Sequence, residues 1–127
     1  MKEMQKYAKQ LVKDMNWEID DANFESSRTS LLNNYMLLTT EVGEVAEELR
    51  RLFNITYQEM KNGTNEQEAF RHGVETVQKD LGKEMVDCLA YLMKMANFFE
   101  IDLEEAYYEK MAEVKKRENK DVGVIKK

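Results

Sequence analysis

Four acidic side chains at matched spacing could bind a metal ion. Glu41 and Glu44 lie three residues apart, and Glu84 and Asp87 repeat that spacing further along the chain. On a helix, side chains at i and i+3 are neighbours, and hard divalent cations such as Mg²⁺ prefer oxygen ligands. Two helices so equipped could hold a metal cluster between them. The alternative is that all four are solvated charges on amphipathic helices, as most Glu must be in a chain with 35% charged residues.

Apolar residues at helical spacing predict the helix that carries the first pair. At about 100° per residue, Glu41 and Glu44 lie on one flank of the apolar seam, with Glu48 beside them. We therefore expect Glu41 and Glu44 to be partly buried, whereas Glu47 points away from the seam and should be solvated. Gly43 costs a helix about 1 kcal/mol relative to alanine, which predicts a close neighbour there, either a packed helix or a ligand. The seam steps alternately by four and three residues through Leu31, Tyr35, Leu38, Val42, Val45, Leu49 and Leu52.

A second seam accompanies the second acidic pair. Glu84 and Asp87 lie on one flank of it together with Tyr91, so one helix face presents two carboxylates and a phenol. This seam runs through Leu81, Met85, Cys88, Leu92, Met95 and Phe99.

The complete pattern predicts five helices joined by short polar segments. The segment 16–27, which contains Trp17, is predicted to be a loop, and Asn62-Gly63 marks a turn within a break at 54–64. The helices are expected over residues 2 to about 16, from a cap at Ser26, Ser27 or Thr29 to about 53, from a capping box at Asn65 to about 79, from about Gly82 to about 99, and from a capping box at Asp102 to about 118.

Composition bounds the class of protein. A chain of 127 residues with no proline, five glycines and 43% hydrophobic residues is typical of a single all-α domain, here a four-to-five-helix bundle over 1–127. No apolar run approaches the roughly 20 residues needed to span a bilayer, and the first residues lack the apolar core of a signal peptide. We therefore expect a cytoplasmic protein without a membrane partner. Cys88, the one cysteine, is expected to be a small buried hydrophobe.

Charge and histidine content exclude two other classes. The net charge of −6 argues against a nucleic-acid binder, although residues 109–127 carry seven Lys/Arg against four acids. A carboxylate-bridged di-iron bundle needs Glu-x-x-His twice, and the chain has only one histidine, His72, with Ala69 three residues before it. His72 is expected to be exposed and without a role in metal binding.

The two acidic segments together carry a resemblance. Residues 38–47 (LTTEVGEVAE) and 81–89 (LGKEMVDCL) resemble the ExxE…ExxD signature of the all-α, MazG-like nucleoside triphosphate pyrophosphohydrolases. The similarity continues through Tyr91, Asn97 and residues 101–106 to the basic stretch 115–120, and so covers most of residues 30–121.

The resemblance implies a Mg²⁺-dependent enzyme, with Mn²⁺ as a substitute, that cleaves a nucleoside triphosphate into the monophosphate and pyrophosphate. It implies metal ligands at Glu41, Glu44, Glu84 and Asp87, and Glu44 is our candidate for the general base. It also suggests further substrate-binding residues: Lys110, Arg117 and Lys120 for the phosphates, and Asn34, Tyr91 and Trp17 for the sugar or base. Family members are usually dimers or tetramers, and two long seams in a 15.0 kDa chain also favour a homodimer or homotetramer.

The chain departs from many relatives in two places. Thr40 stands where many relatives carry a further Glu, and the excess length between the acidic pairs falls in residues 54–79. Two alternatives remain open: a non-enzymatic helical dimer or adaptor, and a phosphohydrolase of different nucleotide specificity. The presence of all four acids favours the enzyme.

Overall fold

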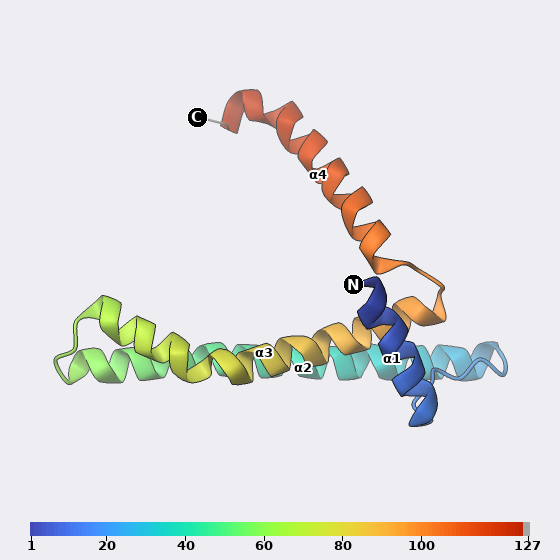
Figure 1. Ribbon diagram of the computed structural model, residues 1–127, viewed down its shortest axis with the longest axis horizontal. Helices are drawn as coiled ribbons and strands as arrows, with labels where there is room; N and C mark the ends of the chain where they lie inside the picture. The colour runs from blue at the N-terminus through green and yellow to red at the C-terminus, as the bar shows by residue number, and fades with distance from the viewer. Residues whose placement is uncertain (126–127) are drawn as a thin grey trace. The chain divides into compact units, whose positions relative to one another are not determined.

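The protein is all-helical. The computed structural model describes the backbone of residues 1–125 and the side chains of residues 1–117 (Figure 1). Over residues 1–125 no strand occurs, which confirms the all-α prediction, and no helix there is long and apolar enough to span a membrane. The helices are α1 (Lys2–Asp14), α2 (Phe24–Lys61), α3 (Glu66–Phe98) and α4 (Leu103–Ile125).

The chain divides into two compact units. The hairpin unit comprises Ile19–Leu92, and therefore contains α2 and most of α3. The terminal unit comprises Met1–Glu18 and Met93–Lys127, and contains α1, the end of α3 and α4. That residues 1–127 form a single domain stays a prediction.

Helix α2 begins earlier than the sequence pattern predicted. The side chain of Asn23 accepts a hydrogen bond from the backbone N–H of Ser26 at 2.9 Å, and the Ser26 hydroxyl accepts one from the backbone N–H of Asn23 at 3.2 Å. Asn caps helices as well as Ser does, and this reciprocal pair satisfies two backbone donors. The predicted caps at Ser26, Ser27 or Thr29 were wrong, because Ser26 is the reciprocal partner three residues inside the helix.

The predicted breaks at 54–64 and near Gly82 were largely wrong. Helix α2 continues to Lys61, with Thr56 buried and its hydroxyl bonded to the Leu52 carbonyl at 2.8 Å. Helix α3 runs through Gly82 without interruption, because packing along 33 residues outweighs a glycine cost of about 1 kcal/mol. The turn at Asn62-Gly63 is confirmed, with Gly63 at φ 102°, and so is the cap at Asn65, whose side chain accepts a hydrogen bond from the Glu68 N–H at 2.9 Å.

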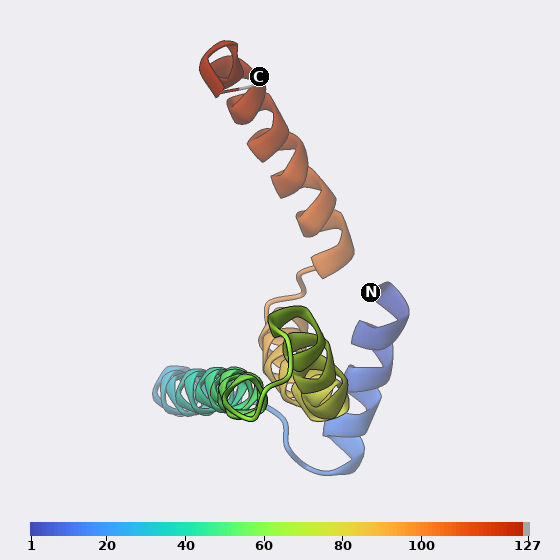
Figure 2. The ribbon, with the colours of Figure 1, turned by 90° about the vertical axis from the view of Figure 1, so that its left-hand side faces the viewer.

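Helices α2 and α3 lie side by side and antiparallel (Figures 1 and 2). Their closest approach is at Gly73, where an added Cβ would lie 2.8 Å from Leu52 Cδ1 and 3.3 Å from the Leu52 carbonyl oxygen. Gly43 has no described atom within 4 Å of such a Cβ, so no helix of this chain packs closely there, and the close approach is at Gly73 instead. A ligand next to Gly43 stays a prediction. The small or short residues Ala69, Gly73 and Val77, spaced one turn apart, are buried and let the helices approach.

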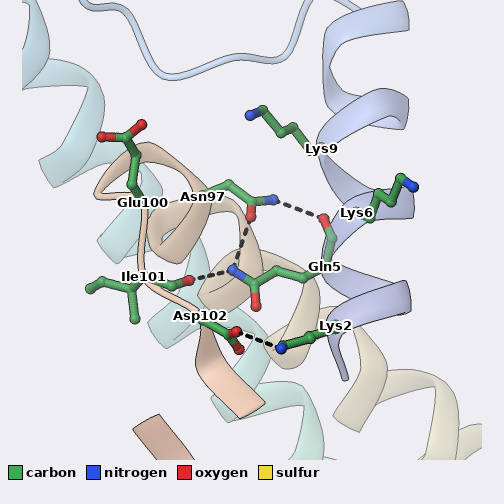
Figure 3. A pocket seen from close by; sticks show the side chains of 8 residues that line it. All are labelled: Lys2, Gln5, Lys6, Lys9, Asn97, Glu100, Ile101 and Asp102. Carbon is green, nitrogen blue, oxygen red and sulfur yellow. Dashed lines mark hydrogen bonds and ion pairs between the residues drawn. The ribbon is translucent and has the colours of Figure 1, made fainter. Parts of the chain in front are cut away.

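In the terminal unit, a buried glutamine joins α1 to the turn between α3 and α4. Gln5 donates through Nε2 to Asn97 Oδ1 at 3.0 Å and to the Ile101 carbonyl (Figure 3). Its Oε1 accepts from the Leu103 N–H at 3.0 Å. Asp102 caps α4 as predicted, accepting from the Glu105 N–H at 3.1 Å. The helix it caps runs to Ile125, beyond the predicted end at about 118.

The close approach at Gly73 predicts opposite effects for two glycine substitutions. We expect Gly73→Ala to lower the free energy of unfolding by about 1 kcal/mol or more, because the new methyl group overlaps Leu52. Gly82→Ala, where nothing described lies within 4 Å of the new Cβ, should raise it by about 1 kcal/mol through helix propensity. Urea unfolding followed by circular dichroism measures both, and a stabilised Gly73→Ala would contradict the packing described here.

Candidate metal centre

Three of the four predicted acidic residues come together in the hairpin unit. Glu41 on α2, and Glu84 and Asp87 on α3, each place a carboxylate oxygen so that the three atoms lie within 4.8 Å of one another. Glu41 and Glu84 are half-buried and Asp87 is exposed. Three hard oxygen donors at this separation could hold a divalent cation.

Antiparallel pairing of the two helices explains why these residues meet. Asn34 of α2 contacts Tyr91 of α3, because its side-chain N–H donates to the Tyr91 carbonyl at 3.3 Å. Glu41 lies seven residues after Asn34 in α2, and Glu84 lies seven residues before Tyr91 in α3. Seven residues are about two helical turns, so the second contact repeats the first on the same faces. The spacing of three in Glu84-x-x-Asp87 then adds the third carboxylate one turn away.

The carboxylates are crowded enough to perturb one another. Partial burial raises the pKa of Glu84 above its ordinary value of 4.5, and the negative charges of Asp87, Glu41, Glu44 and Glu48 raise it further. Without a cation, the ionised form of Glu84 is therefore disfavoured in the folded protein.

The thiol of Cys88 lies in the same acidic surroundings. Partial burial raises its pKa, and the charges of Glu41, Asp87 and Glu84 add to that effect. The thiol is half-buried rather than fully buried and stays protonated at neutral pH. A reactive thiolate is thereby disfavoured.

The other acids of the first motif differ in their surroundings. Glu44 is exposed and lies outside the three-carboxylate group, although it is close enough to raise the pKa of Glu84. The expected partial burial of Glu44 was therefore wrong, while that of Glu41 is confirmed. Glu47 is exposed as predicted and pairs with Arg50 at 2.7 Å.

A basic side chain that the sequence analysis did not single out, Arg51, lies next to these acidic residues. Arg51 contacts Glu48 at 2.8 Å and Asp80 of α3 at 3.1 Å, so it bridges the two helices. The i, i+3 spacing of Glu48 and Arg51 was a readable signal, but Asp80 lies on a different helix and only pairing of α2 with α3 brings it close.

The predicted substrate-binding residues are spread over both units. Asn34 is 1% exposed, and Tyr91 is half-buried next to it in the hairpin unit. Trp17 is 55% exposed in the loop after α1. In α4, the side chains of Lys110 and Arg117 are exposed, whereas that of Lys120 lies outside the described residues. Their roles stay predictions.

One exposed histidine and one open pocket lie outside the three-carboxylate group. His72 is exposed as predicted and contacts the Glu59 carboxylate across the α2–α3 pair. In the terminal unit, an open pocket of about 350 Å³ is lined by Lys2, Lys6 and Lys9 of α1 opposite Glu100 and Asp102 (Figure 3). Lys2 pairs with Asp102 at 3.4 Å.

The three-carboxylate group lies within a domain that matches a known protein family. The model of the MazG nucleotide pyrophosphohydrolase domain matches residues 29–122, about three quarters of the chain. The chain belongs to the MazG family. Its MazG domain contains both acidic pairs as well as Lys110, Arg117 and Lys120, whereas Trp17 lies before it.

The family match supports nucleotide pyrophosphohydrolase activity and a small-molecule nucleotide partner for this MazG chain. Searches of curated proteins and of solved structures found no match. The finer details of substrate and cofactor therefore depend on the residues themselves.

The raised pKa of Glu84, caused by partial burial and then by the neighbouring carboxylates, predicts a pH-dependent gain in stability from Glu84→Gln. A carboxyl whose pKa is raised by folding destabilises the folded protein when it ionises, so stability rises as the pH falls through its folded pKa. In the presence of a chelator, Glu84→Gln should therefore unfold at a higher temperature than the parent at pH 7. The difference should shrink as the pH falls toward 4.5, because the parent Glu84 then also becomes neutral. Differential scanning calorimetry across this range measures it.

Glu47→Gln is the matched control, because Glu47 is exposed on the same helix and paired with Arg50. It should give no such gain at pH 7. A lower unfolding temperature for Glu84→Gln at pH 7 would contradict mutual repulsion at the centre.

Proposed function

We propose that this MazG protein hydrolyses nucleoside or deoxynucleoside triphosphates to the monophosphate and pyrophosphate in a Mg²⁺-dependent reaction. The observation that carries the proposal is the meeting of Glu41, Glu84 and Asp87 from two helices within the matched MazG domain. The proposed setting is the cytoplasm, and the proposed role is control of the nucleotide pool or removal of non-standard nucleotides.

The donor set fits a hard divalent cation. All three groups offer carboxylate oxygens, which Mg²⁺ and Mn²⁺ prefer over nitrogen or sulfur ligands. Burial, and after it the charges of neighbouring acids, raise the pKa of Glu84, and a bound cation would favour its ionised form. In this proposal Glu41, Glu84 and Asp87 hold the cation, and Glu44 is a fourth ligand or the base. When bound, such a cation neutralises the triphosphate and makes a coordinated water more acidic.

Glu44 is our candidate for the general base. Its carboxylate is exposed and outside the three-carboxylate group, one turn along α2 from Glu41. It can accept the proton of a water molecule whose oxygen attacks the α-phosphorus. The bond between the α-phosphorus and the oxygen that bridges the α and β phosphates then breaks, and pyrophosphate leaves with that oxygen. A carboxylate that lies near the three-carboxylate group without binding the metal accepts a proton more readily than a carboxylate that is a metal ligand.

The remaining contacts with substrate are proposed from residue chemistry. Lys110, Arg117 and Lys120 are cations suited to phosphate oxygens. The half-exposed indole of Trp17 offers an aromatic face for a nucleobase, and Tyr91 stands one heptad along the hairpin from the carboxylates. We assign these residues to the phosphates and to the sugar or base, respectively. Asn34 is 1% exposed and faces Tyr91, so the contact with sugar or base predicted for it is not part of this assignment.

A product assay tests the activity. Incubation with Mg²⁺ and a panel of canonical and damaged nucleoside and deoxynucleoside triphosphates should release pyrophosphate and the monophosphate, without orthophosphate. Release of orthophosphate would instead indicate a phosphohydrolase of different specificity. If no substrate releases either product, the non-enzymatic adaptor becomes the better description.

Matched carboxylate variants sharpen this assay. Glu41→Gln, Glu84→Gln and Asp87→Asn should each weaken Mg²⁺ binding in calorimetry and lower kcat by about 100-fold or more. Glu44→Gln should lower kcat similarly, by about 100-fold, while Mg²⁺ still binds. Glu47→Gln, which removes an exposed charge from the same helix, should leave both quantities unchanged. Loss of Mg²⁺ binding in Glu44→Gln would make Glu44 a ligand instead of the base.

We further propose that the protein is a homodimer or homotetramer. Large apolar side chains remain exposed along α2 in the single chain, and water contact of this extent favours association. They include Tyr35 at 53%, Val42 at 54%, Leu49 at 38% and Phe53 at 49% exposed.

Light scattering tests the assembly. At micromolar concentration we expect a mass of two or four times 15.0 kDa. Replacing Val42 and Phe53 together with Ser should shift the population toward the monomer, whereas replacing exposed Lys83 with Ser should not. A monomeric parent protein would contradict the proposal.

A further inference from the structure

Asn34 is a polar residue buried between two helices. It is 1% exposed, on the face of α2 that packs against α3. Its side-chain N–H makes one hydrogen bond, to the Tyr91 carbonyl at 3.3 Å, and its Oδ1 is buried without a described partner. A buried acceptor without a partner costs free energy, and an apolar side chain at the same place avoids that cost.

Unlike a leucine, the asparagine forms a hydrogen bond that fixes the orientation of α2 relative to α3. Apolar contacts between helices have no preferred direction, whereas a hydrogen bond is made only over a narrow range of distance and angle. A buried polar residue in a helix seam is a recognised way of restricting helix pairing at the expense of stability.

Asn34 and the contact at Gly73 join α2 and α3 on opposite sides of the acidic cluster. The turn at residues 62–65 and the close contact of Leu52 with Gly73 hold α2 and α3 together on one side of the acidic cluster. Asn34 and Tyr91 hold them together on the other side, two turns beyond Glu41 and Glu84. Between these contacts, carboxylate oxygens of Glu41, Glu84 and Asp87 lie within 4.8 Å of one another, and ionised carboxylates at that separation repel.

We propose that Asn34 is a positioning residue that locks the open end of the α2–α3 hairpin, so that Glu41 faces Glu84 and Asp87. It acts through helix placement, without touching the cation or the reacting phosphate. Its consequence for metal binding rests on the proposed function, whereas its consequence for helix placement does not.

The experiment separates helix placement from metal binding. Nitroxide labels on Thr29 and Ala90, both exposed, report the open end of the hairpin by pulsed electron paramagnetic resonance. Labels on exposed Gln58 and Gln78 report the turn end as an internal control. Cys88 is replaced by Ser in every sample, and labelled chains are diluted with unlabelled protein so that distances are read within one chain.

Asn34→Leu should unfold at a temperature about 3 °C or more higher without metal, because the unpaired oxygen is gone. The distance distribution of the open-end pair should nevertheless broaden or shift, with that of the turn-end pair unchanged. Mn²⁺ affinity measured by calorimetry should fall by roughly tenfold, because the carboxylates lose their alignment. Stability and metal affinity thus move in opposite directions, which a merely structural residue would not produce.

Val45→Leu, an apolar change at a half-buried position of α2, is the matched control and should keep the parent distances and affinity. If Asn34→Leu does not fold, Asn34→Ala carries the same expectations for distances and Mn²⁺. An unchanged open-end distance in the folded variant overturns the positioning role, whatever the metal result. Changed distances with no Mn²⁺ binding even by the parent would leave the positioning role standing and defeat the proposed function.

Discussion

The structure of the hairpin unit depends on a balance between packing and charge repulsion. Three carboxylates from two helices lie within 4.8 Å of one another, and two more acids, Glu44 and Glu48, contribute to the field that raises the pKa of Glu84. Left alone, such a group would separate the helices that carry it. It persists because the helices are joined on both sides of it, by the Gly73 contact toward the turn and by Asn34 toward the open end. Arg51 adds a counter-charge that bridges Glu48 and Asp80.

Pairing of the two helices also explains how the acidic residues could bind a metal ion together, which neither acidic pair indicates alone. One ExxE on a helix is a common surface pattern, and the exposed, ion-paired Glu47 shows how ordinary such a glutamate can be. Antiparallel pairing turns Glu41 and Glu84 into neighbours, and the MazG match over residues 29–122 places that neighbourhood within a nucleotide pyrophosphohydrolase domain.

Much of this could be predicted from the sequence, and the failures have physical causes. The all-α class and the acidic pairs follow from residue spacing, because helical periodicity is a local property. The breaks expected at 54–64 and at Gly82 were largely wrong, because packing against a partner helix stabilises residues whose own pattern is weak. The Asn23 cap was missed because several nearby residues could cap equally well. The bridge from Arg51 to Asp80 and the burial of Asn34 depend on the pairing of two helices, which no local pattern reveals.

Within the hairpin unit, the carboxylate cluster is built from two helices, α2 and α3. Two helices lying side by side offer a ligand only one wall, whereas nucleotide-sized ligands in proteins are usually covered over most of their surface. A second wall must therefore come from elsewhere. With the proposed second copy as that wall, catalysis becomes a property of the assembly. Turnover per chain would then depend on protein concentration, falling on dilution even though every chain remains folded.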